Sequence, residues 1–172
     1  GRGPCRADRR SWLNHYRMMP DVLPVCRCHA WLRAADGPGY LVIEDRGKPN
    51  LRDRVSALDA RQRRPLLAAA MRLIAGCQGF GLQPRDLKAT NVVVGDGPAG
   101  SAEVALVDCD AVHVNARIGN RQRARGLEQF LANLPASVSR RERLRAAAAY
   151  RREAGLEREA LRAILRRVPS SQ

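Results

Sequence analysis

The chain has 172 residues, of which 31 are Lys or Arg and 17 are Asp or Glu, so its formal net charge is +14. This length fits one domain or part of a larger one, and no apolar run approaches the length of a membrane span. A chain this basic attracts anionic partners, such as nucleic acid, phosphorylated glycans or an anionic membrane surface.

The N-terminal quarter of the chain predicts one helix and one β-hairpin. Apolar and aromatic residues recur at helical spacing over residues 7–18. Residues 25–32, which can form a strand, and the short apolar run 40–43 flank the sequence Asp36-Gly37-Pro38-Gly39, which is typical of a turn. We therefore expect two antiparallel strands in this part of the chain.

Two helices with polar N-caps are expected next. Asn50 precedes a short helical segment over residues 51–58, and Asp59 precedes a longer one. Apolar residues at intervals of three and four give the longer helix one buried face, and Gly79 and Gly81 end it. That face consists of Leu66, Leu67, Ala70, Leu73, Ile74 and Cys77.

A polar loop and a second hairpin follow. The loop Arg85-Asp86-Leu87-Lys88-Ala89-Thr90-Asn91 leads directly into the apolar run 92–94. A linker of turn residues, 95–101, separates it from a second apolar run, 104–107, which ends in Asp108-Cys109-Asp110. Apolar runs joined by turn residues predict two strands with a surface loop between them.

The C-terminal third is expected to be helical. Residues 126–134 are weakly helical, and Ser139 with Glu142 forms a capping box for a helix that ends at Gly155. A last helix over residues 157–168 places apolar residues inward, and the arginines of both final helices are expected on a solvated face. The outward arginines of the last helix are Arg158, Arg162 and Arg166.

The loop and the strand end carry the residues best suited to chemistry. Phosphoryl transfer from a metal-bound nucleotide needs a carboxylate near the acceptor hydroxyl, an amide oxygen and a carboxylate for Mg²⁺, and a cation near the transferred phosphate. Asp86, Asn91, Asp108 and Lys88 supply that set. Lys88 is one of only two lysines in a chain that otherwise uses Arg, and a compact ammonium suits a point contact with phosphate.

The arrangement D-L-K-x-x-N, hairpin and D-x-D resembles the C-terminal lobe of a protein-kinase-like fold. The triplet Asp108-Cys109-Asp110 in place of D-F-G, and the absence of an A-P-E motif, are similar to the bacterial lipopolysaccharide kinase family of inner-core heptose and Kdo kinases. The stretch from Ala149 to Leu156 matches the A-Y-x-x-x-x-G-L pattern of that family. The resemblance extends from Ala7 to Val168.

This resemblance implies an α+β fold, mainly the helical C-terminal lobe of a kinase. Residues 1–46 would be the remnant of an N-terminal lobe, one helix and a β-hairpin, together with the hinge. Residues 47–172 would be the kinase-like C-terminal lobe with basic C-terminal helices.

The resemblance also implies ATP and Mg²⁺ as cofactors and gives each residue of the set a role. Asp86 would be the catalytic base, and Lys88 would steady the transferred phosphate. Asn91 and Asp108 would be metal ligands, and Asp110 would either aid metal or substrate binding or simply cap a turn. The hinge that meets adenine through backbone groups would consist of Ile43, Glu44, Asp45 and Arg46, and Arg85 would be the structural arginine of the loop.

Three departures from the family pattern affect activity. Pro84 stands where the loop usually has His, and Ser11 stands near the place of the Glu that pairs with the nucleotide lysine. No Gly-rich loop or V-A-I-K strand precedes them, so the phosphates lack a lid and one cation. We expect this chain alone to be a poor catalyst, either because an N-terminal lobe was lost from the sequence or because the protein is a degenerate kinase derivative.

The function predicted first is ATP-dependent phosphorylation of a sugar hydroxyl, heptose or Kdo, in the lipopolysaccharide inner core. The alternatives are a catalytically inactive, kinase-derived binding protein, and a small-molecule or protein kinase of another kinase-like family. The expected partner is an anionic glycolipid or sugar phosphate, with peripheral contact to an anionic membrane. Nucleic acid is disfavoured because few aromatic residues are available to stack on bases.

The cysteines indicate a reducing compartment. They are five in number and scattered, and Cys26-Arg27-Cys28-His29, their one cluster, lacks a second ligand pair at zinc-site spacing. Together with the absence of a signal-peptide pattern, this predicts a cytoplasmic protein, peripheral on the inner face of the cytoplasmic membrane.

Overall fold

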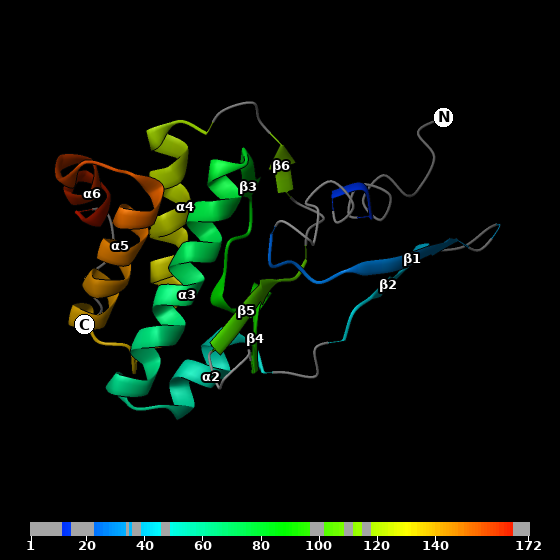
Figure 1. Ribbon diagram of the computed structural model, residues 1–172, viewed down its shortest axis with the longest axis horizontal. Helices are drawn as coiled ribbons and strands as arrows, with labels where there is room; N and C mark the ends of the chain where they lie inside the picture. The colour runs from blue at the N-terminus through cyan, green and yellow to red at the C-terminus, as the bar shows by residue number, and fades with distance from the viewer. Residues whose placement is uncertain are drawn as a thin grey trace.

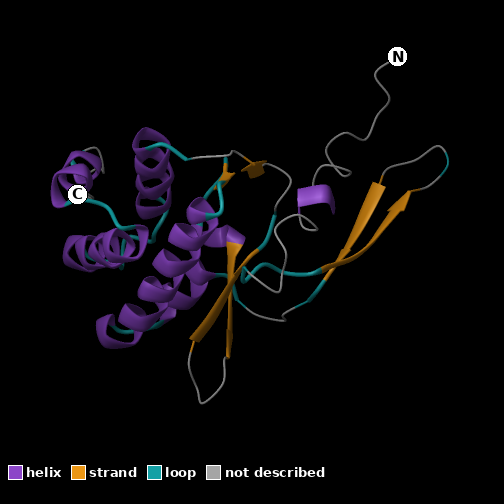
Figure 2. Cartoon of the chain, turned by 45° about the horizontal axis from the view of Figure 1, so that its top comes forward, coloured by secondary structure: helices purple, strands orange, loops and turns teal. Residues whose placement is uncertain are grey.

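The computed structural model describes residues 12–14, 23–33, 35, 39–45, 49–96, 102–108, 112–114 and 118–166. A group of helices occupies one end of the molecule and a β-hairpin projects from the other, with a second hairpin between them (Figures 1 and 2). The six described strands form three separate two-stranded sheets. This mixture of helices and small antiparallel sheets confirms the predicted α+β class.

The first hairpin is present as predicted. Strand β1 (Cys28–Arg33) pairs antiparallel with β2 (Gly39–Ile43), and the pairing is irregular between Cys28 and Ala30. The strand begins later than expected, because Val25 instead makes an isolated parallel bridge to Leu106. This bridge anchors the chain before the first hairpin beside the strand that contains Leu106.

Of the helix predicted over residues 7–18, the described part is residues 12–14, and these are helical. The ring of Trp12 lies 6.2 Å, centroid to centroid, from that of Trp31 in β1, at an interplanar angle of 31°. This aromatic contact holds the N-terminal helical turn against the hairpin.

Both polar N-caps act as the sequence predicts. The Asn50 side chain accepts a hydrogen bond from the Asp53 N–H at 3.0 Å and begins α2 (Leu51–Ala57). Asp59 accepts from the backbone N–H groups of Arg61 and Gln62 and begins α3 (Ala60–Gly79). Each bond satisfies an N–H that the first helical turn leaves without a partner.

Helix α3 is the centre of the core. Its predicted apolar face is buried, and it packs against α5 (Arg140–Ala154) and against strand β5 (Ala102–Leu106). Helices α4 (Asn120–Ala132) and α6 (Arg158–Leu165) complete the helical end of the molecule. The largest fully buried side chains include Tyr150 and Phe130.

Two features of the helical end differ from the sequence prediction. Helix α4 begins at Asn120, ahead of the predicted Gly126. The sequence did not predict this start because the first turn of the helix is polar and shows no apolar periodicity. Arg143 is buried, at 7% exposure, although the arginines of the last helices were expected on a solvated face. The capping box of Ser139 and the end of α5 at Gly155 are both confirmed, and Gly155 has a left-handed backbone.

A third small sheet is absent from the sequence prediction. Strand β3 (Leu82–Pro84) pairs antiparallel with β6 (Val112–Val114). Each strand has three residues, too few for a period-two pattern to be recognised, and the partners lie far apart in the sequence. The pairing fixes the chain immediately before Arg85.

Two buried groups make the stability of the fold sensitive to alkaline pH. Burial raises the pKa of the Cys77 thiol to about 12, from 9.0. Burial also raises the pKa of the Tyr150 phenol to about 12, from 10.0, against the opposing charge of Arg123. Both groups hold their protons more tightly in the folded state, so their contribution to the free energy of unfolding is complete below pH 9.0 and falls as pH rises toward 12.

We therefore expect the urea midpoint of unfolding to be constant between neutral pH and about pH 9, and to fall above it. Cys77→Ala should remove the part of this dependence that begins near pH 9, while Tyr150→Phe should remove the part that begins near pH 10. A midpoint that stays constant up to pH 11 in the unmodified protein would contradict the burial of both groups.

Candidate active site

The second hairpin brings two of the predicted metal ligands to one edge. Strand β4 (Val92–Asp96) pairs antiparallel with β5, with Val92 opposite Leu106. The N–H of Val107 donates to the Asn91 carbonyl oxygen at 2.9 Å. Asn91, just before the first strand, and Asp108, just after the second, are therefore held at the same end of the hairpin.

Asp108 has an unusual backbone. Its φ of 58° is the only positive φ of a non-glycine residue in the described ranges. A side chain costs about 1 kcal/mol or more in this left-handed region, although Asp and Asn tolerate it better than most residues. Such a cost is retained where the side chain must point in a direction that ordinary backbone does not give, and this position fits a functional carboxylate.

Asn91 ties the loop to the hairpin. It ends the 3₁₀ turn Ala89–Asn91, and its Nδ2 donates to the backbone carbonyl oxygen of Asp86 at 3.0 Å. With its amide nitrogen occupied in this way, the amide oxygen is the atom that Asn91 offers to a ligand. The contact closes the five-residue interval between Asp86 and Asn91 that the sequence singled out.

The Asp86 carboxylate is held from two sides. Lys88 Nζ lies 2.6 Å from its Oδ2, and Gln129 Nε2 donates to its Oδ1 at 3.3 Å. The Asp86 side chain keeps 44% of its surface exposed, so it is accessible to a substrate. Gln129 lies on α4, in the segment that was predicted only as weakly helical, and no signal in the sequence connects it with Asp86.

The hinge residues are in part occupied by local contacts. Ile43 ends β2, and the N–H of Glu44 donates to the Arg27 carbonyl oxygen at 2.7 Å. The Glu44 side chain in turn accepts from the Arg27 N–H at 3.0 Å. Asp45 follows in the described chain, while the predicted hinge residue Arg46 and the predicted ligand Asp110 lie outside the described residues.

Asn91 and Asp108 carry oxygen atoms of the kind that Mg²⁺ prefers, at the same end of the hairpin. This ion prefers oxygen ligands and is commonly held by one or two carboxylates, substrate phosphates and water. The Asp108 carboxylate and the Asn91 amide oxygen are ligands of that kind. The described residues contain no cluster of three or more His, Cys, Asp or Glu side chains, so a site built entirely from such protein ligands is not found among them.

Comparisons with known proteins bear on the fold of this chain. The structure is similar to that of WaaP in complex with acyl carrier protein, with a TM-score of 0.68, over 94% of this chain and 77% of that one, at 19% sequence identity. It is also similar to the bifunctional kinase-methyltransferase WbdD, with a TM-score of 0.54, over 95% of this chain and 41% of that one, at 17% identity. The chain has a kinase-like fold.

At these identities the likeness establishes the fold of the chain. Neither a scan against protein-family models nor a search of curated proteins gave a match. The comparison of structures therefore finds a similarity of fold that the comparisons of sequence do not.

A buried polar network supports the loop of the kinase-like chain from behind. The Tyr150 hydroxyl donates to Gln78 Oε1, and Gln78 Nε2 donates to Gln83 Oε1 at 2.9 Å. Gln83 Nε2 then donates to the Pro84 carbonyl oxygen at 3.0 Å, two residues before Asp86. Tyr150 is the tyrosine of the predicted family stretch on α5, so this stretch now has a structural role in holding the loop.

Gly126 leaves room for that network. A Cβ atom at this position would lie 2.8 Å from Gln83 Nε2 and 3.0 Å from Gln78 Nε2. Both amides are engaged in the network and Gln78 is buried, so they cannot move without losing hydrogen bonds. We expect Gly126→Ala to lower the free energy of unfolding by about 1–2 kcal/mol, after the gain in helix propensity is included.

Urea unfolding of the Gly126→Ala variant measures this effect, and Gly76→Ala in α3 is the matched control. A Cβ atom at Gly76 would meet only Leu23 Cδ2, at 3.8 Å, so this substitution should be neutral or stabilising. Equal stability of the two variants would show that a Cβ atom at position 126 does not clash with Gln78 and Gln83.

Proposed function

We propose that this protein is an ATP-dependent phosphotransferase that acts on a sugar hydroxyl, heptose or Kdo, of the lipopolysaccharide inner core. The observation that carries the proposal is the convergence of three predicted residues: Asn91 bonds to the Asp86 backbone and is held at one hairpin edge with Asp108. The kinase-like fold supports the reaction class, and the family-like motifs support the substrate class.

The residues divide the reaction among them. Asp86 accepts the proton of the sugar hydroxyl while the hydroxyl oxygen forms a bond to the γ-phosphorus of ATP. The bond between that phosphorus and the bridging oxygen breaks, and ADP leaves with that oxygen. Lys88, 2.6 Å from Asp86, is placed to contact the transferred phosphate. Asn91 and Asp108 would hold Mg²⁺, which neutralises phosphate charge when bound.

The nucleotide base is assigned to the chain that leaves β2. In this proposal residues 43–46 contact adenine through backbone groups, residues 1–46 form the N-terminal unit, and residues 47–172 form the kinase-like lobe. The Glu44 N–H already donates to Arg27, so Glu44 would contribute its carbonyl oxygen as an acceptor. The Cys26 N–H donates to the Leu106 carbonyl oxygen at 3.1 Å, so the hinge side of the chain is anchored close to Asp108.

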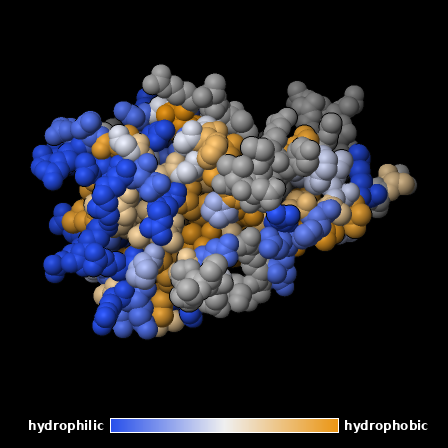
Figure 3. Space-filling model, viewed as in Figure 1, coloured by the Kyte–Doolittle hydropathy of each residue, from blue (hydrophilic) through white to orange (hydrophobic). Residues whose placement is uncertain are grey.

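The basic surface supports an anionic glycolipid as substrate and an anionic membrane surface as its location. Hydrophilic residues gather over the end of the molecule formed by the last helices (Figure 3). Among the described residues, no helix combines the length and apolar character needed to cross a bilayer. The exposed arginines of α5 and α6 include Arg140, Arg141, Arg145, Arg152, Arg158 and Arg162.

The test is transfer of labelled γ-phosphate from ATP by the protein expressed from its complete reading frame. Lipopolysaccharide core lacking inner-core phosphate, casein and an aminoglycoside would be offered in parallel. We expect label in the lipopolysaccharide core alone. Label in casein or the aminoglycoside would instead assign the protein to another kinase-like family, and label in none of them would contradict phosphotransfer.

One observation favours a second candidate, a kinase-derived binding protein without catalysis. Pro84 occupies the position at which the family loop has His, and it is buried and paired with Val112 in the small sheet. A proline there gives the loop a rigid attachment but no side chain that can form a hydrogen bond. This candidate predicts no Mg²⁺-dependent nucleotide binding.

A further inference from the structure

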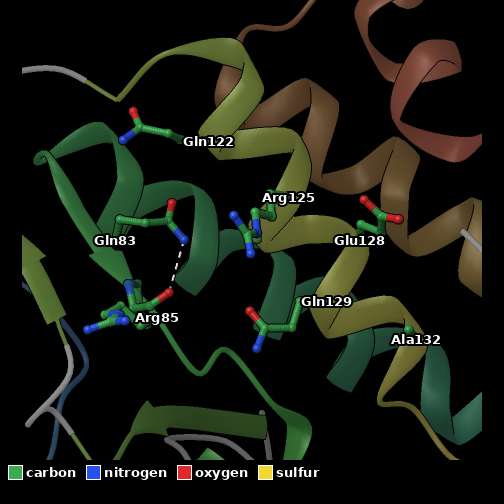
Figure 4. A pocket seen from close by; sticks show the side chains of 9 residues that line it. Gln83, Arg85, Gln122, Arg125, Glu128, Gln129 and Ala132 are labelled. Carbon is green, nitrogen blue, oxygen red and sulfur yellow. Dashed lines mark hydrogen bonds between the residues drawn. The ribbon is translucent and has the colours of Figure 1, made fainter. Parts of the chain in front are cut away.

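A pocket of about 700 Å³ lies between the start of the catalytic loop and helix α4. Gln83, Pro84 and Arg85 form one wall, and α4 forms the other (Figure 4). The α4 wall consists of Gln122, Arg125, Gly126, Glu128, Gln129 and Ala132. Neither the sequence motifs nor the proposed roles of the loop residues assign a function to this pocket.

The pocket opens beside the proposed base. Gln129, which lines it, donates to Asp86 Oδ1 at 3.3 Å, and Arg85, which also lines it, precedes Asp86 in the chain. A molecule in the pocket therefore lies next to the carboxylate that would take a hydroxyl proton. Asn91 bonds to the Asp86 carbonyl oxygen on the hairpin side of the loop, and neither Asn91 nor Asp108 lines this pocket.

The lining is suited to a hydroxylated anion. Arg125 on the α4 wall is exposed, and its guanidinium has no ion pair or hydrogen bond within the described part of the chain, while the Arg85 side chain on the other wall points away from α4 (Figure 4). Arg125 projects between Gln83 and Gln129, while the Glu128 carboxylate points away from it (Figure 4). Guanidinium groups bind phosphate and carboxylate through paired N–H donors, and glutamine amides bind hydroxyl groups.

We infer that this pocket binds the acceptor sugar, with Arg125 holding an anionic group on it and the glutamines contacting its hydroxyls. The inference rests on the proposed function, because it names the acceptor side of the same site. The anionic group is a phosphate or the carboxylate of a sugar acid, since both present oxygen pairs that a guanidinium can grip.

The test compares Arg125→Gln with Arg121→Gln in the full protein. Arg121 is exposed on the same helix and does not line the pocket, so its variant controls for the loss of one positive charge. Three probes are titrated by calorimetry: a deacylated, phosphorylated core oligosaccharide, the same oligosaccharide after dephosphorylation, and free Kdo, which carries only a carboxylate. The Kd of ATP is measured for each variant in parallel.

We expect Arg125→Gln to weaken binding of the anionic probe about tenfold or more, with the ATP Kd unchanged and with Arg121→Gln close to the unmodified protein. Preference for the phosphorylated oligosaccharide identifies phosphate as the group that is held, and binding of Kdo identifies the carboxylate. Equal binding by Arg125→Gln and the unmodified protein, or no binding of any probe, would overturn the inference.

Failure of the proposed function gives a different result. If the unmodified protein binds an anionic probe in an Arg125-dependent manner but transfers no phosphate from ATP, the pocket assignment stands and the phosphotransferase assignment falls. If phosphate is transferred but Arg125→Gln leaves both the acceptor KM and its Kd unchanged, the phosphotransferase stands and the acceptor is bound elsewhere.

Discussion

Asp86→Asn should abolish phosphate transfer while leaving nucleotide binding intact. The asparagine keeps the size of the side chain and an oxygen that can accept from Gln129, but it cannot take a proton from the acceptor hydroxyl. Loss of a positioned base lowers a rate by roughly 10²- to 10⁴-fold. The lost pairing with Lys88 has little effect on stability, because the two side chains are 41% and 44% exposed and solvent screens the pair.

The measurement is the initial rate of γ-phosphate transfer to lipopolysaccharide core, together with the Kd of ATP in the presence of Mg²⁺. Glu153→Gln, which neutralises an exposed carboxylate on α5, is the matched control and should retain the full rate. Transfer by Asp86→Asn at the rate of the control would remove Asp86 from the chemistry and with it the proposed mechanism.

Arg143→Met should be the most destabilising substitution of any arginine in the described chain. Arg143 is buried, and its guanidinium donates to the carbonyl oxygens of Val138, Leu131, Leu134 and Pro135. These oxygens belong to the end of α4 and the turn before α5, where helical carbonyls have no partner within the helix. Burial lowers the pKa of the guanidinium, and the Glu142 carboxylate beside it opposes this shift.

We expect a loss of about 3 kcal/mol in the free energy of unfolding, because several carbonyls lose a charged donor at once. Arg141→Met is the control, since Arg141 is exposed on the same helix and Met has nearly the helix propensity of Arg. Its urea midpoint should stay close to that of the unmodified protein. Equal midpoints for the two variants would show that the buried guanidinium does not hold the turn.

The sequence predicted the parts of the fold that depend on local chemistry. Asn50 and Asp59 were recognised as caps because short polar side chains satisfy the first N–H groups of a helix wherever the helix then packs. The β4–β5 hairpin followed from apolar runs around turn residues. It brought Asn91 and Asp108 to one edge, because antiparallel pairing places the residues before one strand beside those after the other.

The parts that were missed depend on contacts between distant residues. Strands β3 and β6 are short and gain their stability from each other, across the intervening hairpin. Gln129 is hydrogen-bonded to Asp86, 43 positions earlier in the chain. The sequence around a polar residue on a helix does not indicate which distant residue it will contact. Arg143 is one of many arginines in its helix, and only the geometry of the turn before α5 distinguishes it.

The kinase-like site is tested most directly by calorimetric titration of ATP into the unmodified protein and into Asp108→Asn, each with Mg²⁺ and with EDTA. Asparagine tolerates the positive φ of Asp108, so this variant removes a metal-binding charge while the backbone is kept. We expect Mg²⁺-dependent ATP binding that Asp108→Asn weakens about tenfold or more, a difference of ~1.4 kcal/mol. ATP affinity that is the same with Mg²⁺ and EDTA, or the same in both proteins, would contradict the site.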